Sequence, residues 1–98
     1  MKIPAKVRIT SKVSYEVVFA EKVADDPECR GICRFDPKQI VLLMGQSEQM
    51  MVKTFLHEVL HAVDHEHEIG LQHKHVYALE DALAKLFRLN KLFSKKSK

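Results

Sequence analysis

The sequence predicts an α+β domain, in which a small, mostly antiparallel sheet of three to four strands is followed by two amphipathic helices. Two observations carry this prediction. The first half of the chain consists of short runs rich in β-branched and aromatic residues, separated by turn-forming residues. The second half shows apolar residues at helical spacing on either side of Gly70. The 98 residues are enough for one compact domain and too few for two.

Four runs have the composition of strands: KVRIT at 6–10, VSYEVVFA at 13–20, GICRF at 31–35 and QIVLLM at 39–44. Asp25-Asp26-Pro27 predicts a loop, and Asp36-Pro37 predicts a tight reversal of the chain. We therefore expect hairpins formed in sequence order.

The first helix is predicted from Ser47, a good helix cap, to Gly70, which suits a left-handed helix end. With residues placed at 100° intervals, His57 and His61 lie about 40° apart and outside the apolar arc. One face of the helix should pack on the sheet, and another should carry titratable groups. The apolar arc consists of Met51, Val52, Phe55, Leu56, Val59, Leu60, Ala62 and Val63.

The second helix is predicted from Gln72 to Leu89. Glu80 lies at the edge of its apolar stripe, where a carboxylate needs a partner because an unpaired buried charge is costly. We expect a metal ion held by the first helix to be that partner. The stripe consists of Val76, Leu79, Ala82, Leu83, Leu86 and Phe87.

Residues 1–90 are predicted to form the domain and 91–98 a basic, flexible tail. Because the tail holds much of the formal charge of +3, we do not expect nucleic-acid binding. No apolar run approaches a membrane span, and the N-terminus lacks the apolar stretch of a signal peptide, so we expect a cytoplasmic protein. Cys29 and Cys33 are then expected to be reduced thiols, with a disulfide or a second metal site as alternatives.

The chemistry of the chain is concentrated in His57-Glu58-Val59-Leu60-His61, which reads H-E-x-x-H. Two histidines four residues apart stand on one face of a helix, so both can bind one metal ion. Glu58 projects beside them, where it can take a proton from a metal-bound water. Zinc in a hydrolytic site usually has three protein ligands, so a third ligand is required.

Three residues are candidates for the third ligand. Glu80 is favoured, since it lies on a separate helix that can pack antiparallel to the first. His67 has the spacing of the longer H-E-x-x-H-x-x-G-x-x-H pattern, but Asp64 stands where that pattern has its glycine. Asp64 itself is one turn from His61 and could bind the metal or orient a histidine. Solvated surface positions are otherwise expected for His65, His67, His73 and His75.

The run HEVLHAVDHEHEIG, followed by a helix that carries Glu80, resembles the zincin metallopeptidases. It is most similar to the gluzincin group, and in length and element order it resembles the minigluzincins and the small phage-type and ImmA/IrrE-like metallopeptidase domains. The likeness covers residues 31–89. It implies an endopeptidase with Zn²⁺ held by His57, His61 and Glu80, and with Glu58 as general base and acid acting on a peptide or protein substrate.

In these peptidases an edge strand of the sheet binds substrate as an added strand, and we expect residues 39–44 to be that edge. The oxyanion-stabilising residue is left open among Tyr77, His65 and His73. Ala84 stands where some gluzincins have an acidic residue that orients a histidine, and Asp64 could take that role. The competing hypothesis is a non-catalytic, zinc-stabilised binding module, which the small size and the missing acidic residue favour.

Overall fold

The computed structural model describes residues 2–90 and confirms the predicted order of a sheet followed by two helices. The basic tail predicted at 91–98 lies outside the described residues. The observed bounds of the strands differ from the predicted ones by no more than two residues at any end. The elements are β1 (Lys6–Arg8), β2 (Ser14–Ala20), β3 (Gly31–Phe35), β4 (Lys38–Leu43), α1 (Glu48–His67) and α2 (His73–Asn90).

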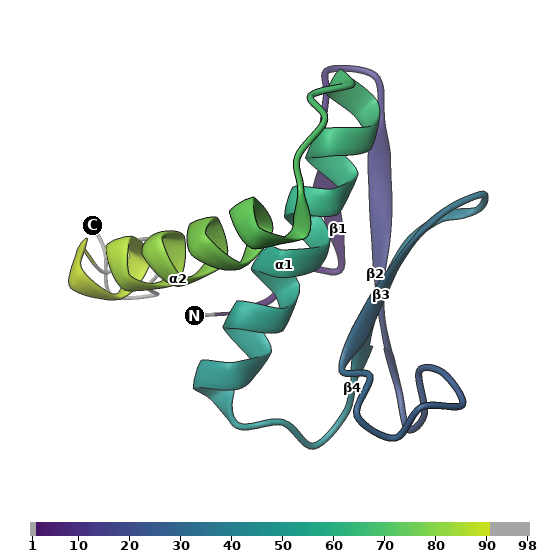
Figure 1. Cartoon of the computed structure of the whole chain (residues 1–98). Coiled ribbons are helices and arrows are strands. Elements are labelled where there is room, and N and C mark those ends of the chain that lie inside the picture. Colours follow the sequence, from purple (N-terminus) through teal and green to yellow (C-terminus); the bar gives the residue numbers. More distant parts are fainter. Residues whose placement is uncertain (1, 91–98) are drawn as a thin grey trace.

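The four strands form one mixed sheet in the order β1-β2-β4-β3 (Figure 1). β1 pairs antiparallel with β2, and β3 with β4, whereas β2 and β4 are parallel. The prediction of hairpins in sequence order is therefore wrong at the centre of the sheet, where the chain crosses over to place β4 beside β2.

The prediction that 39–44 is an edge is also wrong, because β4 lies between β2 and β3. Ile40, Val41 and Leu42 are buried at successive positions, so both faces of β4 are covered. A continuous apolar run is typical of a strand with that environment. The edge of the sheet that contacts α1 belongs instead to β3.

The core lies between the sheet and α1. Along β2, Tyr15 and Val17 are buried, while the alternating Ser14 and Glu16 are exposed, as the pleat of a one-sided strand requires. Burying a large apolar side chain contributes roughly 1.5–3 kcal/mol, so a few such residues hold α1 on the sheet. The core cluster consists of Tyr15, Val17, Ile40, Leu42, Phe55 and Ala62.

Both ends of α1 are capped by local side-chain and backbone contacts. The Ser47 hydroxyl accepts a hydrogen bond from the Met50 N–H, as its sequence position predicts. At the other end Glu68 takes the left-handed conformation (φ 52°), and its N–H donates to the Asp64 carbonyl. The predicted stop, Gly70 (φ 88°), therefore lies in the link to α2, just beyond the cap of the helix.

A polar contact joins the last turns of α1 to the sheet. The buried Tyr15 hydroxyl donates to Glu66 Oε2 at 2.7 Å, and Lys38 Nζ lies 2.6 Å from the same oxygen. These two donors, the lysine first, hold the pKa of Glu66 below its usual value. One carboxylate thus connects α1 to both β2 and β4.

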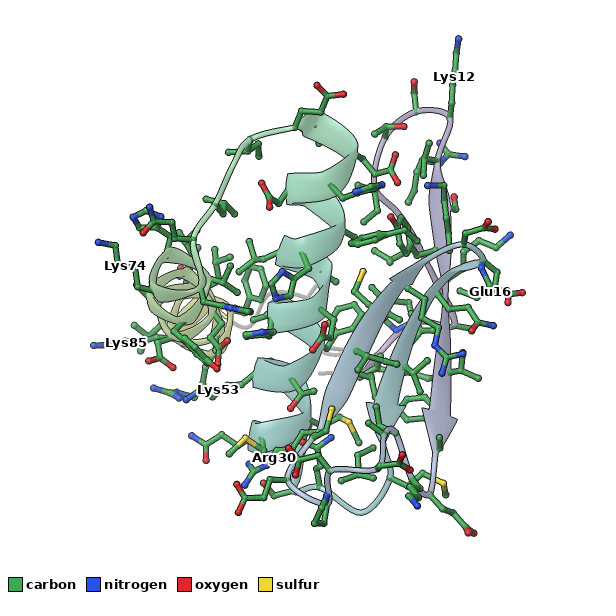
Figure 2. All side chains as sticks on the ribbon, turned by 45° about the vertical axis from the view of Figure 1, so that its right-hand side comes forward. Lys12, Glu16, Arg30, Lys53, Lys74 and Lys85 are labelled. Atoms are coloured by element: carbon green, nitrogen blue, oxygen red, sulfur yellow. The ribbon has the colours of Figure 1, made fainter. Side chains whose placement is uncertain are left out.

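Helix α2 projects from α1 on the side away from the sheet (Figure 1). Among the described elements it contacts α1 and no strand, and Val76 is its one fully buried residue. An ion pair of 2.7 Å between Lys53 and Asp81 joins the two helices, and Lys74 and Lys85 point away from α1 (Figure 2). Within residues 2–90, no helix has the length and apolar character to cross a membrane.

Candidate metal centre and cleft

Helix α1 brings the two histidines of the H-E-x-x-H motif together. Their Nε2 atoms lie 3.1 Å apart, and the ring centroids are 4.7 Å apart. Tetrahedral zinc with bonds of about 2.0–2.1 Å separates neighbouring nitrogens by roughly 3.3 Å, which is close to this spacing. Burial, followed by the neighbouring His57 and His73, lowers the pKa of His61 and so favours the neutral form that binds metal.

A third imidazole faces this pair from the first residue of α2. The ring of His73 lies 5.0 Å from that of His61 and 5.8 Å from that of His57, measured between centroids. One ligand nitrogen from each of the three histidines lies within 4.8 Å of the other two. The sequence analysis expected His73 at a solvated surface position or as a candidate for oxyanion stabilisation, and did not count it among the candidates for the third metal ligand. Its approach depends on how the chain turns between the helices, which residue spacing does not reveal.

Glu80, the predicted third ligand, lies against His57. Its Oε1 is 2.6 Å from His57 Nδ1, and the two side chains are only 12% and 16% exposed. The expectation that a buried carboxylate on α2 needs a partner holds, but the partner observed is a histidine. The three-histidine group does not include Glu80, and its predicted role as a metal ligand stays a prediction.

The Asp64 side chain accepts hydrogen bonds from the turn between the helices. Its Oδ1 accepts hydrogen bonds from the N–H groups of Gly70 and Leu71, at 2.6 and 2.9 Å. These bonds, that of Leu71 first, hold the pKa of Asp64 below its usual value. The carboxylate therefore shapes the turn that leads to His73.

The other histidines have different surroundings. His65 stacks on Phe35 at the end of β3, with centroids 3.9 Å apart, so it does not face the three-histidine group. His67 is exposed at the end of α1. His75 accepts a hydrogen bond of 3.3 Å from the Gln72 N–H at the start of α2.

The motif glutamate is buried beneath the edge strand. Glu58 is 6% exposed, and this burial raises its pKa to about 7, with Glu80 adding to the effect and His57 opposing it. A Cβ atom added to Gly31, the first residue of β3, would lie 3.3 Å from Glu58 Cγ and 2.7 Å from Thr54 Cγ2. Glycine at this position thus allows β3 to approach the helix where the motif glutamate stands.

A cleft of about 330 Å³ opens beside Glu58 between the start of β3, α1 and α2. The Tyr77 ring lies 5.1 Å from that of His57 and lines the cleft. Of the three oxyanion candidates, Tyr77 is therefore the one that borders this space. The lining residues are Glu28, Cys29, Arg30, Gly31, Met50, Lys53, Thr54, His57, Glu58, Tyr77 and Glu80.

The two cysteines are free thiols. Cys29 borders the cleft, and its Sγ lies 3.4 Å from the Gly31 carbonyl oxygen. Burial, together with the charge of Glu58, raises the pKa of Cys33 to about 12. Cys33 therefore stays protonated near neutral pH, unlike a thiolate poised for metal binding.

Comparison of the chain with protein-family models, with curated proteins and with solved structures gave no match in any of the three.

Proposed function

We propose that the protein is a zinc-dependent metallopeptidase whose helix α1 supplies two metal ligands and the general base. The observation that carries this proposal is the convergence of the Nε2 atoms of His57 and His61 next to a buried glutamate that borders a cleft. The donor set fits zinc, which favours imidazole nitrogen and leaves a position for water in hydrolytic sites. The sequence resemblance to gluzincins points to the same reaction class.

Each residue of the site has a separate role in the proposed hydrolysis of a peptide bond. His57 and His61, with a third ligand, would hold a Zn²⁺ ion, which would lower the pKa of a water molecule and polarise the substrate carbonyl. Glu58 would act as the general base that accepts a proton from the attacking water and as the general acid that returns it to the leaving amine. Burial raises the pKa of Glu58 to about 7, and a pKa near neutrality suits a group that must both accept and release a proton. The Tyr77 hydroxyl, at the wall of the cleft, donates a hydrogen bond to the oxygen of the reacting carbonyl.

The proposed substrate is a peptide or protein segment in extended conformation. β3 ends the sheet on the side of the cleft and so offers backbone groups for an added strand. The approach of Gly31 to Glu58 means that a strand added along β3 would pass beside the general base. β3, in place of β4, is therefore the proposed substrate-binding edge.

The proposal is tested by separating metal binding from hydrolysis. Purified protein should contain about one zinc per chain and cleave members of a mixed peptide library, with products identified by mass spectrometry. Glu58→Gln should retain zinc and lose cleavage by about 10²–10⁴-fold, the usual contribution of a general base. Glu68→Gln, which neutralises an exposed glutamate just beyond α1, is the matched control and should leave cleavage unchanged.

Two results would contradict this proposal in different ways. Full cleavage by the Glu58→Gln variant would refute the assigned mechanism. Zinc-loaded protein that cleaves no peptide, yet unfolds when the metal is chelated, would favour the zinc-stabilised binding module. One observation supports that alternative: the three histidines come from both helices, so a metal ion held among them would link α1 to α2.

A further inference from the structure

We infer that His73 is the third metal ligand and that Glu80 is a positioning residue, which holds His57 without binding the metal. The inference rests on the metal site of the proposed function and assigns a different role to each of two residues of α2. Its basis is the distinct partner of each nitrogen of His57.

The two ring nitrogens of His57 face opposite ways. Nε2 lies 3.1 Å from His61 Nε2, so this nitrogen belongs to the space where the histidines converge. Nδ1 lies 2.6 Å from Glu80 Oε1. An imidazole that binds metal through Nε2 carries its proton on Nδ1, and a carboxylate that accepts this proton fixes both the tautomer and the plane of the ring.

Glu80 is consequently on the wrong side of the His57 ring to act as a ligand. Its oxygen meets the nitrogen that points away from His61, and the ring itself separates it from the point of convergence. Moving the carboxylate to that point would break the hydrogen bond to Nδ1. The Nδ1–H of a side chain that is only 16% exposed would then lose its acceptor, which is unfavourable because water cannot readily replace it.

His73 already lies near the point of convergence. Its ligand nitrogen is within 4.8 Å of those of both other histidines, and its ring is perpendicular to that of His61 (87°). The turn that delivers it is held by Asp64 through the N–H groups of Gly70 and Leu71. Three imidazoles with an open fourth position form a recurrent donor set for hydrolytic zinc.

The experiment compares zinc affinity among variants of the full chain, measured by competition with a chromophoric chelator. His73→Ala should lower zinc affinity by more than about 100-fold, beyond the 10- to 100-fold range expected for loss of a residue that orients a ligand. Glu80→Gln should fall within that range. His67→Ala, which removes an exposed histidine outside the group, is the matched control and should bind zinc as the parent does. Circular dichroism checks that each variant is folded.

X-ray absorption on the zinc-loaded proteins counts the imidazole ligands directly. Three imidazoles are expected in the parent and in Glu80→Gln, and two in His73→Ala. Two imidazoles in the parent, together with unchanged zinc affinity in His73→Ala and a loss beyond about 100-fold in Glu80→Gln, would overturn the inference and make Glu80 the ligand.

These readouts do not depend on catalysis. A parent protein that binds zinc through three imidazoles but cleaves no peptide would refute the proposed function and leave the ligand assignment intact. Cleavage that depends on Glu58, combined with two imidazoles at the metal, would support the proposed function and refute the ligand assignment. A parent protein that takes up no zinc would overturn both.

Discussion

Replacement of Gly31 by alanine tests whether the edge strand must lie directly on α1. The added Cβ would stand 2.7 Å from Thr54 Cγ2, 3.1 Å from the Val41 carbonyl oxygen and 3.3 Å from Glu58 Cγ. The first distance is shorter than real Cβ atoms show, so β3, the helix or the Thr54 side chain must shift. Thr54 and Glu58 are both buried, and neither can swing into solvent without disturbing its surroundings.

The expected cost is that of an overpacked core position, about 1–3 kcal/mol of unfolding free energy. For a domain of this size each kcal/mol lowers the melting temperature by about 4–8 °C, so a decrease of roughly 5–20 °C is expected. Thermal and urea unfolding, followed by circular dichroism, measure both quantities. Because the shift displaces Glu58 Cγ, peptide cleavage should fall more than zinc affinity does.

Thr54→Ser provides the matched rescue. Serine lacks the Cγ2 methyl group that meets the new Cβ, yet it keeps the hydroxyl that donates to Gln46 Oε1 at 2.8 Å. Alone it should cost about 1 kcal/mol for the lost methyl group. Combined with Gly31→Ala, it should recover part of the stability, with a favourable coupling energy of about 0.5 kcal/mol or more. The contact between the new Cβ and the Val41 carbonyl oxygen would remain in the double variant, so the recovery of stability should be incomplete.

If the unfolding free energy of Gly31→Ala lies within about 0.5 kcal/mol of the parent, the ordinary range for surface substitutions, then β3 does not need to lie directly on α1. Strict additivity in the double variant would also contradict the prediction, because the two methyl groups would then not compete for the same space.

Three further predictions concern the ends of α1 and the turn that follows. Ser47→Ala should lower the unfolding free energy by about 1 kcal/mol in urea denaturation, and an unchanged midpoint would show that the cap is dispensable. Lys38 and Tyr15 lower the pKa of Glu66 from its ordinary 4.5, so its charged form stabilises the fold above that pH and is lost as pH falls through the lower folded value. Glu66→Gln should therefore flatten the decline in stability below about pH 4.5, and an identical pH profile would rule this contact out as a cause. Asp64→Ala should weaken zinc binding about tenfold or more in the chelator assay, because the turn that delivers α2 loses its acceptor, and parent-like affinity would show that the turn holds by other means.

The helical half of the fold could be predicted because its information is local. The period of the apolar residues, the cap at Ser47 and the turn near Gly70 each depend on neighbours within a few positions. The spacing of His57, Glu58 and His61 belongs to the same category, and the structure brings these side chains together as that spacing requires.

The order of the strands could not be predicted in the same way, because strand pairing depends on partners far apart in the chain. β2 pairs with β4 across a link that contains all of β3. One signal in the sequence did point to the centre of the sheet. The unbroken apolar run Ile40-Val41-Leu42 indicates a strand covered on both faces, whereas Gly31–Phe35 contains Arg34 and suits an edge.

The surroundings of Glu80 and His73 depend on the packing of α2 against α1. The position of Glu80 at the edge of an apolar stripe predicted that it would have a partner. Which residue is that partner depends on how closely the two helices pack, which the sequence does not give. The position of His73 depended on more than the packing of the helices. A turn of a few residues, held by Asp64, determines where His73, the first residue of α2, lies.

The sparse packing of α2 has a consequence for how the protein opens. An 18-residue helix of this kind is marginal in isolation, and this one is attached to the rest of the described chain through α1 alone, with Val76 as its one buried residue. Its backbone amides should exchange with solvent through local detachment, well before the sheet and α1 unfold together. A metal ion shared between α1 and α2 would raise the free energy of that detachment alone. Hydrogen exchange with and without zinc should then show protection gained in α2 and its turn, while the amides of β2 and β4 stay as they were.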